Sequence, residues 1–309
     1  MILCLDGGTT NTRIRLMDGT RTVDAEAVKI GSSERDNRAL RDAVAQMIRT
    51  LLTRNGLRET DIPAILAAGM VTSEFGLYEL PHLLLPAGID ELAHGAKRVE
   101  MPEITSIPFW FVPGVKGTDA EPDMMRGEET ECVGLCAAMG VREPAAVILP
   151  GTHNKVILFD GERMTAIASM MSGEMIAALS GHTLLRHSLP DPLPKAYDEE
   201  ALFAGADYCR QYGLTDAALR VRSIAKAGTR TPEWLSSYLV GAVLYCDIIS
   251  IREKSHGYPL LIGGSDPLRS EVTLLAARYL DNRLLPVDPD LSAAATAVGQ
   301  DRIYSAICR

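Results

Sequence analysis

Two short stretches of the chain nearly repeat each other, and this repeat constrains the fold more than any other feature. They are LDGGTTNTRIRLMDG, residues 5–19, and LPGTHNKVILFDG, residues 149–161. Aligned from Gly8 and Gly151, both have a G-T-x-N core, a run with the pattern of a strand, and a closing Asp-Gly turn typical of hairpins. Two unrelated turns could match by chance, but the shared order favours two similar domains that each carry one polar hairpin.

The pattern of apolar residues predicts a similar succession of elements after both copies. Strands are expected at residues 3–5, 12–17, 21–30, 64–68, 110–113, 147–149, 155–159, 164–169, 259–262 and 283–287. Helices are expected at residues 38–56, 128–139, 173–179, 199–211, 215–227, 233–251 and 269–280, and from residue 291 onward. We therefore predict an α/β protein with an N-terminal domain, residues 1–144, and a C-terminal domain, residues 145–309.

Composition, charge and cysteine usage predict a cytoplasmic protein that acts on small molecules. No stretch approaches a membrane span, and Asp6 interrupts the first apolar run, so we expect neither a membrane segment nor a signal peptide. The six cysteines form no Cys-x-x-Cys pair, which favours reduced thiols over a metal site. A net charge of −9 argues against a nucleic-acid surface, although local Arg or Lys residues with Mg²⁺ could still bind an anionic small molecule. A homo-oligomer is compatible with these features.

Both hairpin loops have the chemistry of a phosphate-binding site. Glycine backbone can approach an anion closely, short polar side chains add donors, and Asp6 could hold hydrated Mg²⁺ through its waters. The candidate ligands are Gly7, Gly8, Thr9, Thr10 and Asn11 in the first loop and Gly151, Thr152, His153 and Asn154 in the second. Either loop alone could be an ordinary turn, but two such loops around one triphosphate would position it for transfer and exclude water.

Four motifs resemble parts of the actin, sugar-kinase and heat-shock ATPase superfamily. DGGTTNTR resembles its first phosphate loop, and PGTHNK stands in the place of the second. LLIGGSDP is similar to the strand and glycine pair that bind adenosine, which makes Gly263 and Gly264 nucleotide-binding candidates. LSAAATAVG is similar to the late connecting helix. The resemblance implies two actin-like (ribonuclease H-like) domains around an interdomain cleft that binds ATP and Mg²⁺.

A closer resemblance links the chain to the 2-dehydro-3-deoxygalactonokinase family. The motifs that carry it occur in order and are AAGMVTSEFGLYELPHLLLPAG, PGVKG, DMMRGEETE, LPGTHNKVILFDGE and MSGEM. The similarity runs from about residue 3 to residue 175, and the C-terminal third is less similar. The resemblance implies ATP-dependent phosphorylation of 2-dehydro-3-deoxy-D-galactonate at its C6 hydroxyl, in galactonate degradation.

The second loop departs from the superfamily pattern, because Pro150 stands where an aspartate usually begins that loop. The general base must therefore come from elsewhere, and MRGEETE, residues 125–131, is the best candidate. Exopolyphosphatases and type III pantothenate kinases are similar in placing an acidic residue there. Glycine spacing favours Glu129 and adjacency favours Glu128, so both are candidates. The alternative is that both are helix-start carboxylates favoured by the helix dipole.

Several cationic and polar residues are candidates for contact with the sugar acid or the phosphates. Arg126 could bind a carboxylate in bidentate fashion, and Ser73 and Lys116 are weaker candidates that are equally typical of turns and surfaces. Arg13 and Lys155 follow the two loops and could face phosphate, although strand alternation could also turn them away.

Two other functions fit the same motifs. A phosphatase or polyphosphate hydrolase of this fold would use the glutamate to activate water instead of a sugar hydroxyl. A nucleotide-dependent sensor would bind ATP without turnover, but the chain shows no DNA-binding segment, coiled coil or polymer-forming insertion. A kinase is therefore the favoured prediction.

Overall fold

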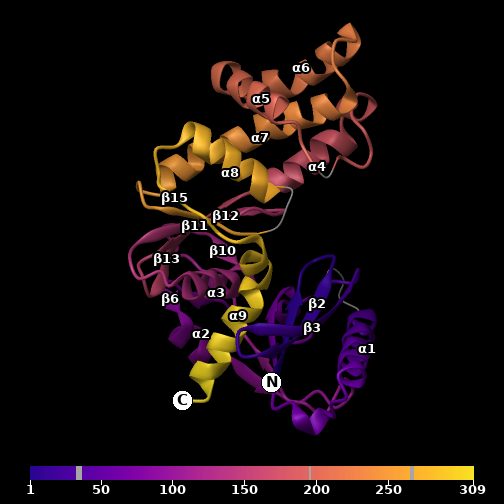
Figure 1. Cartoon of the computed structure of the whole chain (residues 1–309), viewed down its shortest axis with the longest axis vertical. Coiled ribbons are helices and arrows are strands. Elements are labelled where there is room, and N and C mark those ends of the chain that lie inside the picture. The colour runs from indigo at the N-terminus through magenta and orange to yellow at the C-terminus, as the bar shows by residue number, and fades with distance from the viewer. Residues whose placement is uncertain (33–36, 195, 265–267) are drawn as a thin grey trace. The chain divides into compact units, whose positions relative to one another are not determined.

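The structure is a computed structural model that describes residues 1–32, 37–194, 196–264 and 268–309 (Figure 1). The chain passes between two units more than once. The first unit comprises residues 1–143, 159–167 and 290–309, and the second comprises residues 144–158 and 168–289. The C-terminal segment therefore belongs to the same unit as the N-terminal strand.

The first unit is built on a six-stranded sheet with the order β3-β2-β1-β4-β8-β7. Its strands are β1 (Ile2–Gly7), β2 (Thr12–Asp18), β3 (Arg21–Val28), β4 (Ile65–Gly69), β7 (Lys97–Val99) and β8 (Phe109–Phe111). β1 and β2 form the predicted antiparallel hairpin, whereas β4 runs parallel to both β1 and β8. The parallel pairing brings the carboxyl ends of β1 and β4 to the same edge of the sheet.

Alternation along the hairpin separates two faces of this sheet. Leu3, Leu5, Ile14 and Leu16 are buried in one cluster with the apolar side of α1 (Arg38–Arg54). On the opposite face, Cys4 and Arg15 contact α9 (Pro289–Ile307), and the Arg15 guanidinium donates to Ala293 O at 2.6 Å. The sheet is thus covered on both faces, as its apolar strands predict.

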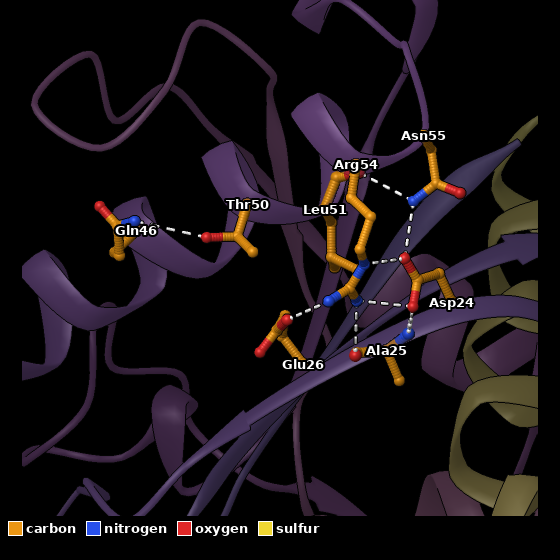
Figure 2. Close-up of polar contacts among 8 residues, drawn as sticks. All are labelled: Asp24, Ala25, Glu26, Gln46, Thr50, Leu51, Arg54 and Asn55. Carbon is orange, nitrogen blue, oxygen red and sulfur yellow. Dashed lines mark hydrogen bonds and ion pairs between the residues drawn. The ribbon is translucent and has the colours of Figure 1, made fainter.

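The end of α1 is joined to β3 by an exposed polar cluster, which Figure 2 shows. The Arg54 guanidinium contacts both carboxylate oxygens of Asp24 at 2.6 Å and Glu26 at 2.6 Å, and Asn55 donates to Asp24 at 2.8 Å. These hydrogen bonds lower the pKa of Asp24 to about 2. Because the cluster is at the surface, we assign it to local order between α1 and β3 and not to a site.

The remaining elements of the first unit are short, apart from one helix. They are η1 (Glu59–Asp61), η2 (Met70–Thr72), β5 (Leu83–Leu84), β6 (Ala87–Gly88), α2 (Ile89–Gly95), β9 (Val115–Lys116), β10 (Met124–Met125) and α3 (Glu128–Met139). β10, β9 and β5 form a three-stranded sheet, and β6 pairs with the start of β13 (Arg163–Met170). The sequence predicted α3 but none of the short strands, because two residues carry no periodicity.

Two glycines let α3 and α9 pack backbone against backbone. A Cβ atom at Gly134 would lie 1.9 Å from Ala295 O, and a Cβ atom at Gly299 would lie 1.9 Å from Thr130 O. Both distances are far below van der Waals contact, so no other residue fits without moving a helix. This contact fixes the first turn of α3, where the acidic candidates are.

We predict that Gly299→Ala lowers the free energy of unfolding by about 1–3 kcal/mol, because the new methyl group forces the two helices apart. The control is Gly181→Ala, since a Cβ atom at Gly181 meets nothing within 4 Å. Alanine favours a helix over glycine by about 1 kcal/mol, so the control should be neutral or stabilising. Denaturant unfolding checks both, and equal effects would contradict the packing argument.

The second unit has a sheet with the order β15-β14-β11-β12-β13. Its strands are β11 (Ala145–Leu149), β14 (Leu260–Ile262), β15 (Leu284–Leu285) and β12 (Asn154–Phe159), together with the end of β13. The sheet packs with α4 (Ser172–His182), η3 (Leu184–His187), α5 (Glu199–Tyr212), α6 (Leu214–Ala227), α7 (Pro232–Lys254) and α8 (Leu268–Tyr279). The three strands predicted around each hairpin loop are confirmed, as β1, β2 and β3 around the first loop and β11, β12 and β13 around the second.

α7 is the central helix of the second unit. Among the described residues it is the one helix long and apolar enough to cross a membrane, but 78% of its apolar window is buried inside the protein. It packs closely on α5, where Gly205 and Gly241 face backbone carbonyls of the partner helix. A core helix explains its apolar character. Its single buried acid, Asp247, lies within this apolar stretch and belongs to the site described below.

Candidate functional site

The first loop is a hairpin turn with a fixed backbone. Gly8 N donates to Asn11 O at 2.8 Å, and Ser32 N donates to Gly8 O at 3.0 Å. Gly31 lies against the loop so closely that a Cβ atom there would be 2.4 Å from the carbonyl carbon of Thr9. The exposed residues of the loop are Gly8, Thr9, Thr10 and Asn11. The predicted phosphate ligands of this loop are therefore held in place and open to solvent, whereas Gly7 is buried in β1.

Asp6 lies at the carboxyl end of β1, beside the loop. The strand register places it directly opposite Arg13 on β2 and beside Ala68 on β4. Burial raises the pKa of Asp6, while the positive charges of Arg15 and Arg13 lower it. The side chain is half-buried and lines a cavity, and a bound cation would stabilise its charged form.

A cavity of about 460 Å³ adjoins the first loop, and its volume is that of a small-ligand site. Its lining residues are Asp6, Gly8, Asn11, Thr12, Arg13, Ala27, Val28 and Lys29. Arg13 and Lys29 are exposed, and neither charged group has a hydrogen bond or ion pair with another residue that the structure describes. Their charges are therefore available to an anion in this cavity, and Lys29 is a residue that the sequence did not single out.

Two glycines bring the acidic segment next to the end of β1. Gly69 has φ +82°, and a Cβ atom there would lie 2.4 Å from Gly7 O and 3.4 Å from Asp6 Oδ1. Gly127 has φ +114°, and its Cβ atom would lie 3.1 Å from Gly69 Cα. Only glycine suits both positions. The start of α3 thus lies next to Gly69, and Gly69 in turn lies next to Asp6.

Glu129 is fully buried in the first turn of α3. Its two carboxylate oxygens accept from Gly127 N at 2.9 and 2.8 Å. Burial and then the charge of Glu128 raise the pKa of Glu129 to about 8, against the lowering effect of backbone hydrogen bonds and Arg126. A carboxyl group with a pKa near neutrality is suited to proton transfer. Glu128 is partly exposed, and its carboxylate accepts from Arg126 N at 3.1 Å.

The Arg126 guanidinium is occupied by its own unit. It donates to Thr72 O at 2.6 Å, to Leu80 O at 2.9 Å and to His82 Nδ1 at 3.2 Å. Because Nδ1 accepts, His82 is neutral, and burial with the nearby charges of Arg126 and Lys116 lowers its pKa to about 4. Arg126 thus fixes residues 72–82, and a contact with substrate carboxylate stays a prediction.

The other two substrate candidates lie in different surroundings. The Ser73 hydroxyl donates to Met70 O at 2.7 Å and accepts from Phe75 N at 3.3 Å, so it closes a turn after β4. Lys116 is exposed on β9. Among the described residues, no contact joins either Ser73 or Lys116 to Asp6.

The second loop is held through Asn154. Its side-chain oxygen accepts from Gly151 N at 2.7 Å, and its amide nitrogen donates to Asp247 Oδ2 at 2.5 Å. Thr152 and His153 are exposed, and His153 Nε2 lies 2.8 Å from Glu174 Oε2. Asn154 is therefore a buried support of the loop, whereas the sequence predicted a phosphate donor.

Lys155 turns inward from the second loop. It is buried, and its ammonium group donates to Ser169 Oγ at 2.6 Å. The sequence left open whether the Lys155 side chain faces the loop or points away from it. Its burial and its hydrogen bond to Ser169 indicate that it points away from the exposed part of the loop.

The predicted adenosine glycines contact the start of the second loop. Gly263 N donates to Ile148 O at 2.9 Å. Gly264 has φ +81°, and a Cβ atom there would lie 2.9 Å from Pro150 O. A side chain at position 264 would therefore displace the loop as well as any nucleotide. The rest of this motif, residues 265–267, lies outside the described residues.

Asp6 is the one metal candidate that the sequence named. Within residues 1–32, 37–194, 196–264 and 268–309, no group of three or more His, Cys, Asp or Glu residues could hold a metal ion by itself. Mg²⁺ commonly binds one or two carboxylates and completes its shell with waters and substrate phosphate. A single half-buried carboxylate beside exposed hydroxyls fits that mode and does not fit a site made by the protein alone.

The match to known proteins covers nearly the whole chain. The sequence profile of the 2-keto-3-deoxy-galactonokinase family matches residues 6–298. A 2-dehydro-3-deoxygalactonokinase of Escherichia coli strain K12 is 26% identical over 288 residues, which are 90% of this chain and 87% of that protein. Both hairpin loops, the acidic segment and Asp247 lie within the residues that the family profile matches.

Solved structures show the same fold. A crystal structure assigned to a 2-dehydro-3-deoxygalactonokinase from Sinorhizobium meliloti has a TM-score of 0.81 and 22% identity, with 99% of this chain and 97% of that chain covered. The activator of the 2-hydroxyisocaproyl-CoA dehydratase from Clostridium difficile, solved with bound ADPNP, has a TM-score of 0.51 and 11% identity, with 99% and 95% covered. The predicted actin-like α/β fold is confirmed.

Proposed function

The chain belongs to the 2-keto-3-deoxy-galactonokinase family and is a sugar kinase, and on this premise we propose that it phosphorylates 2-dehydro-3-deoxy-D-galactonate. ATP is the phosphoryl donor, the C6 hydroxyl is the acceptor, and the product is the 6-phosphate formed in galactonate degradation. The observation that carries the proposal is the family match over residues 6–298, since it includes Asp6, both loops and Glu129.

Each of the two loops is proposed as a phosphate-binding element for ATP. In the first unit, Gly8 to Asn11 present backbone and hydroxyl donors from a fixed turn. In the second unit, Thr152 and His153 are the exposed residues of a loop that the buried Asn154 side chain holds in place. Phosphoryl transfer depends mainly on positioning and charge stabilisation, which preformed loops supply.

Asp6 is proposed to hold Mg²⁺ through its waters at the end of β1. The ion, when bound, neutralises charge on the transferring phosphate. Burial raises the pKa of Asp6 although Arg15 and Arg13 lower it, so a divalent cation beside the carboxylate would stabilise its charged form.

Glu129 is proposed to accept the proton of the C6 hydroxyl. Its segment contacts the strand end that carries Asp6 through Gly69 and Gly127. A carboxylate has about four lone-pair sites, so it can accept a further hydrogen bond besides those from the backbone N–H groups of Gly127 and Glu129. Glu128, whose carboxylate caps Arg126 N, is proposed to support the segment.

The cavity beside the first loop is proposed to bind a phosphate group through Arg13 and Lys29. We predict that Lys29→Gln raises the KM for ATP about five- to tenfold, because an exposed charge beside phosphate contributes on the order of 1 kcal/mol. Lys97→Gln on β7 is the matched control, since Lys97 is also exposed and lies outside this cavity. An unchanged KM for ATP in Lys29→Gln would contradict this role.

A coupled ADP-release assay across 2-keto-3-deoxy aldonates and plain aldonates tests the proposed function. We expect ADP release that requires a 2-keto-3-deoxy acid and is fastest with the galactonate derivative. A phosphatase or polyphosphate hydrolase would release phosphate without the sugar acid, and a sensor would bind ATP without release. Either result would refute the proposal.

A further inference from the structure

Asp247 is a buried acid in the most apolar helix of the second unit. It is 2% exposed, and its neighbours along α7 are largely apolar. Its Oδ2 atom accepts from Asn154 Nδ2 at 2.5 Å, and its Oδ1 atom accepts from Ser172 Oγ at 2.5 Å. An unpaired carboxylate in such surroundings would be costly, so these two hydrogen bonds account for its presence there. Both partners belong to motifs that flank the exposed part of the second loop.

The carboxylate decides which way the Asn154 amide points. A carboxylate only accepts, so the amide nitrogen must face Asp247. The amide oxygen is then directed to Gly151 N, from which it accepts at 2.7 Å. This bond closes the turn that leaves Thr152 and His153 exposed. With a neutral apolar residue at position 247, only the hydrogen bond from Gly151 N would still favour this orientation.

The segment Ser172-Gly173-Glu174 is joined to the same loop, by Gly173 and Glu174 directly and by Ser172 through Asp247. Ser172 shares Asp247 with Asn154, and Glu174 N donates to Thr152 O at 3.0 Å. A Cβ atom at Gly173 would lie 2.2 Å from Gly151 O, so the start of α4 lies directly on the loop backbone. The motifs PGTHNK and MSGEM, which are about 20 residues apart in the sequence, are thus two sides of one buried network.

We propose that Asp247 is a positioning residue for ATP: through Asn154 and Ser172 it holds the second loop and the start of α4 in the conformation that binds phosphate. The inference rests on the proposed function, because it assigns phosphate binding to this loop. Where the wider superfamily begins the loop with an aspartate, this chain has Pro150. The acid that serves the loop comes from α7 instead and acts on the protein, not on metal.

The test compares Asp247→Leu, Asp247→Asn and Ser172→Ala with the control Ser236→Ala. Ser236 is a fully buried serine of α7 whose hydroxyl donates to Pro232 O at 2.9 Å, away from the loop. Loss of a charged buried hydrogen bond changes an equilibrium by about tenfold or more. We therefore expect Asp247→Leu and Ser172→Ala to raise the KM for ATP about tenfold, with the KM for the sugar acid changed less than about twofold.

The conservative variant separates positioning from general stability. An asparagine side chain at position 247 can still accept from Asn154, so Asp247→Asn should keep the KM for ATP within about threefold of the parent. Equal effects of Ser172→Ala and Ser236→Ala, or equal rises in both KM values, would overturn the proposal. Should Asp247→Leu fail to fold, Ser172→Ala against Ser236→Ala decides alone.

ATP affinity measured by calorimetry distinguishes this proposal from the proposed function. Weaker ATP binding in Ser172→Ala but not in Ser236→Ala supports the positioning role even if the parent shows no sugar-acid turnover, an outcome that would refute only the kinase reaction. Unchanged ATP affinity in both variants would refute the positioning role even if the parent is an active kinase.

Discussion

Replacement of Glu129 by glutamine is expected to lower kcat by about 10²–10⁴, while ATP affinity stays within a few-fold of the parent. Glutamine keeps the size of the side chain and can still accept from Gly127 N, but it cannot take the proton of the acceptor hydroxyl. The ADP-release assay gives kcat, and calorimetry gives the affinity for ATP. The matched control is Glu128→Gln, which removes a carboxylate from the adjacent residue and should be mild.

The pH dependence of the parent gives the same prediction a second readout. Because burial raises the pKa of Glu129 to about 8, the neutral acid dominates below that pH and the carboxylate base above it. The parent's kcat/KM should therefore rise as pH increases toward about 8 and then level off, and Glu129→Gln should lack this rise. If both glutamine variants turn over within a few-fold of the parent, the acidic pair only starts a helix and the base lies elsewhere.

Replacement of Asp6 by asparagine is expected to lower kcat about a hundredfold or more without loss of the fold, because Mg²⁺ loses a full charge at its binding site. Burial raises the pKa of Asp6, which means that the charged carboxylate is less favourable in the folded protein than in the unfolded chain. The Asp6→Asn variant should therefore have an unfolding temperature that is unchanged or higher. Activity across a Mg²⁺ titration and thermal unfolding check the two halves of this prediction.

Asp18→Asn is the control for Asp6→Asn. Asp18 is the exposed last residue of β2, beside the turn to β3, and pairs with Arg21 at 3.4 Å. Its loss should leave kcat within about twofold, since exposed ion pairs contribute little. A folded Asp6→Asn variant with near-normal kcat would contradict the metal role of Asp6.

The sequence predicted those parts of the fold that depend on residues close together in the chain. Alternation in residues 12–17 and the turns at Gly19 and Gly161 are sufficient to place both hairpins, and the apolar stripe of α1 identifies its buried face. The return of α9 to the first unit was not predicted, because backbone contacts at Gly134 and Gly299 have no signature beyond small residues.

The site could be predicted only in part, because several of its contacts join residues that are far apart in the sequence. For loop residues such as Thr9, the residue type and the spacing to neighbouring glycines are enough to predict a role in phosphate binding. Asp247 lies 93 residues from Asn154, and only its isolation as an acid in an apolar helix was a signal. Lys29 follows a strand end and enters the cavity through strand pairing. The occupied guanidinium of Arg126 depends on residues 46 and 54 positions away, which no local pattern contains.

The measurement that tests the central claim most directly is the ratio of products formed by the parent enzyme with ATP, Mg²⁺ and 2-dehydro-3-deoxygalactonate. ADP, sugar-acid phosphate and inorganic phosphate would be quantified together, with and without the sugar acid. We predict ADP and sugar-acid phosphate in a one-to-one ratio, with little inorganic phosphate and little ADP when the acid is omitted. Inorganic phosphate formed in step with ADP, whether or not the acid is present, would contradict the assignment of this chain as a sugar-acid kinase.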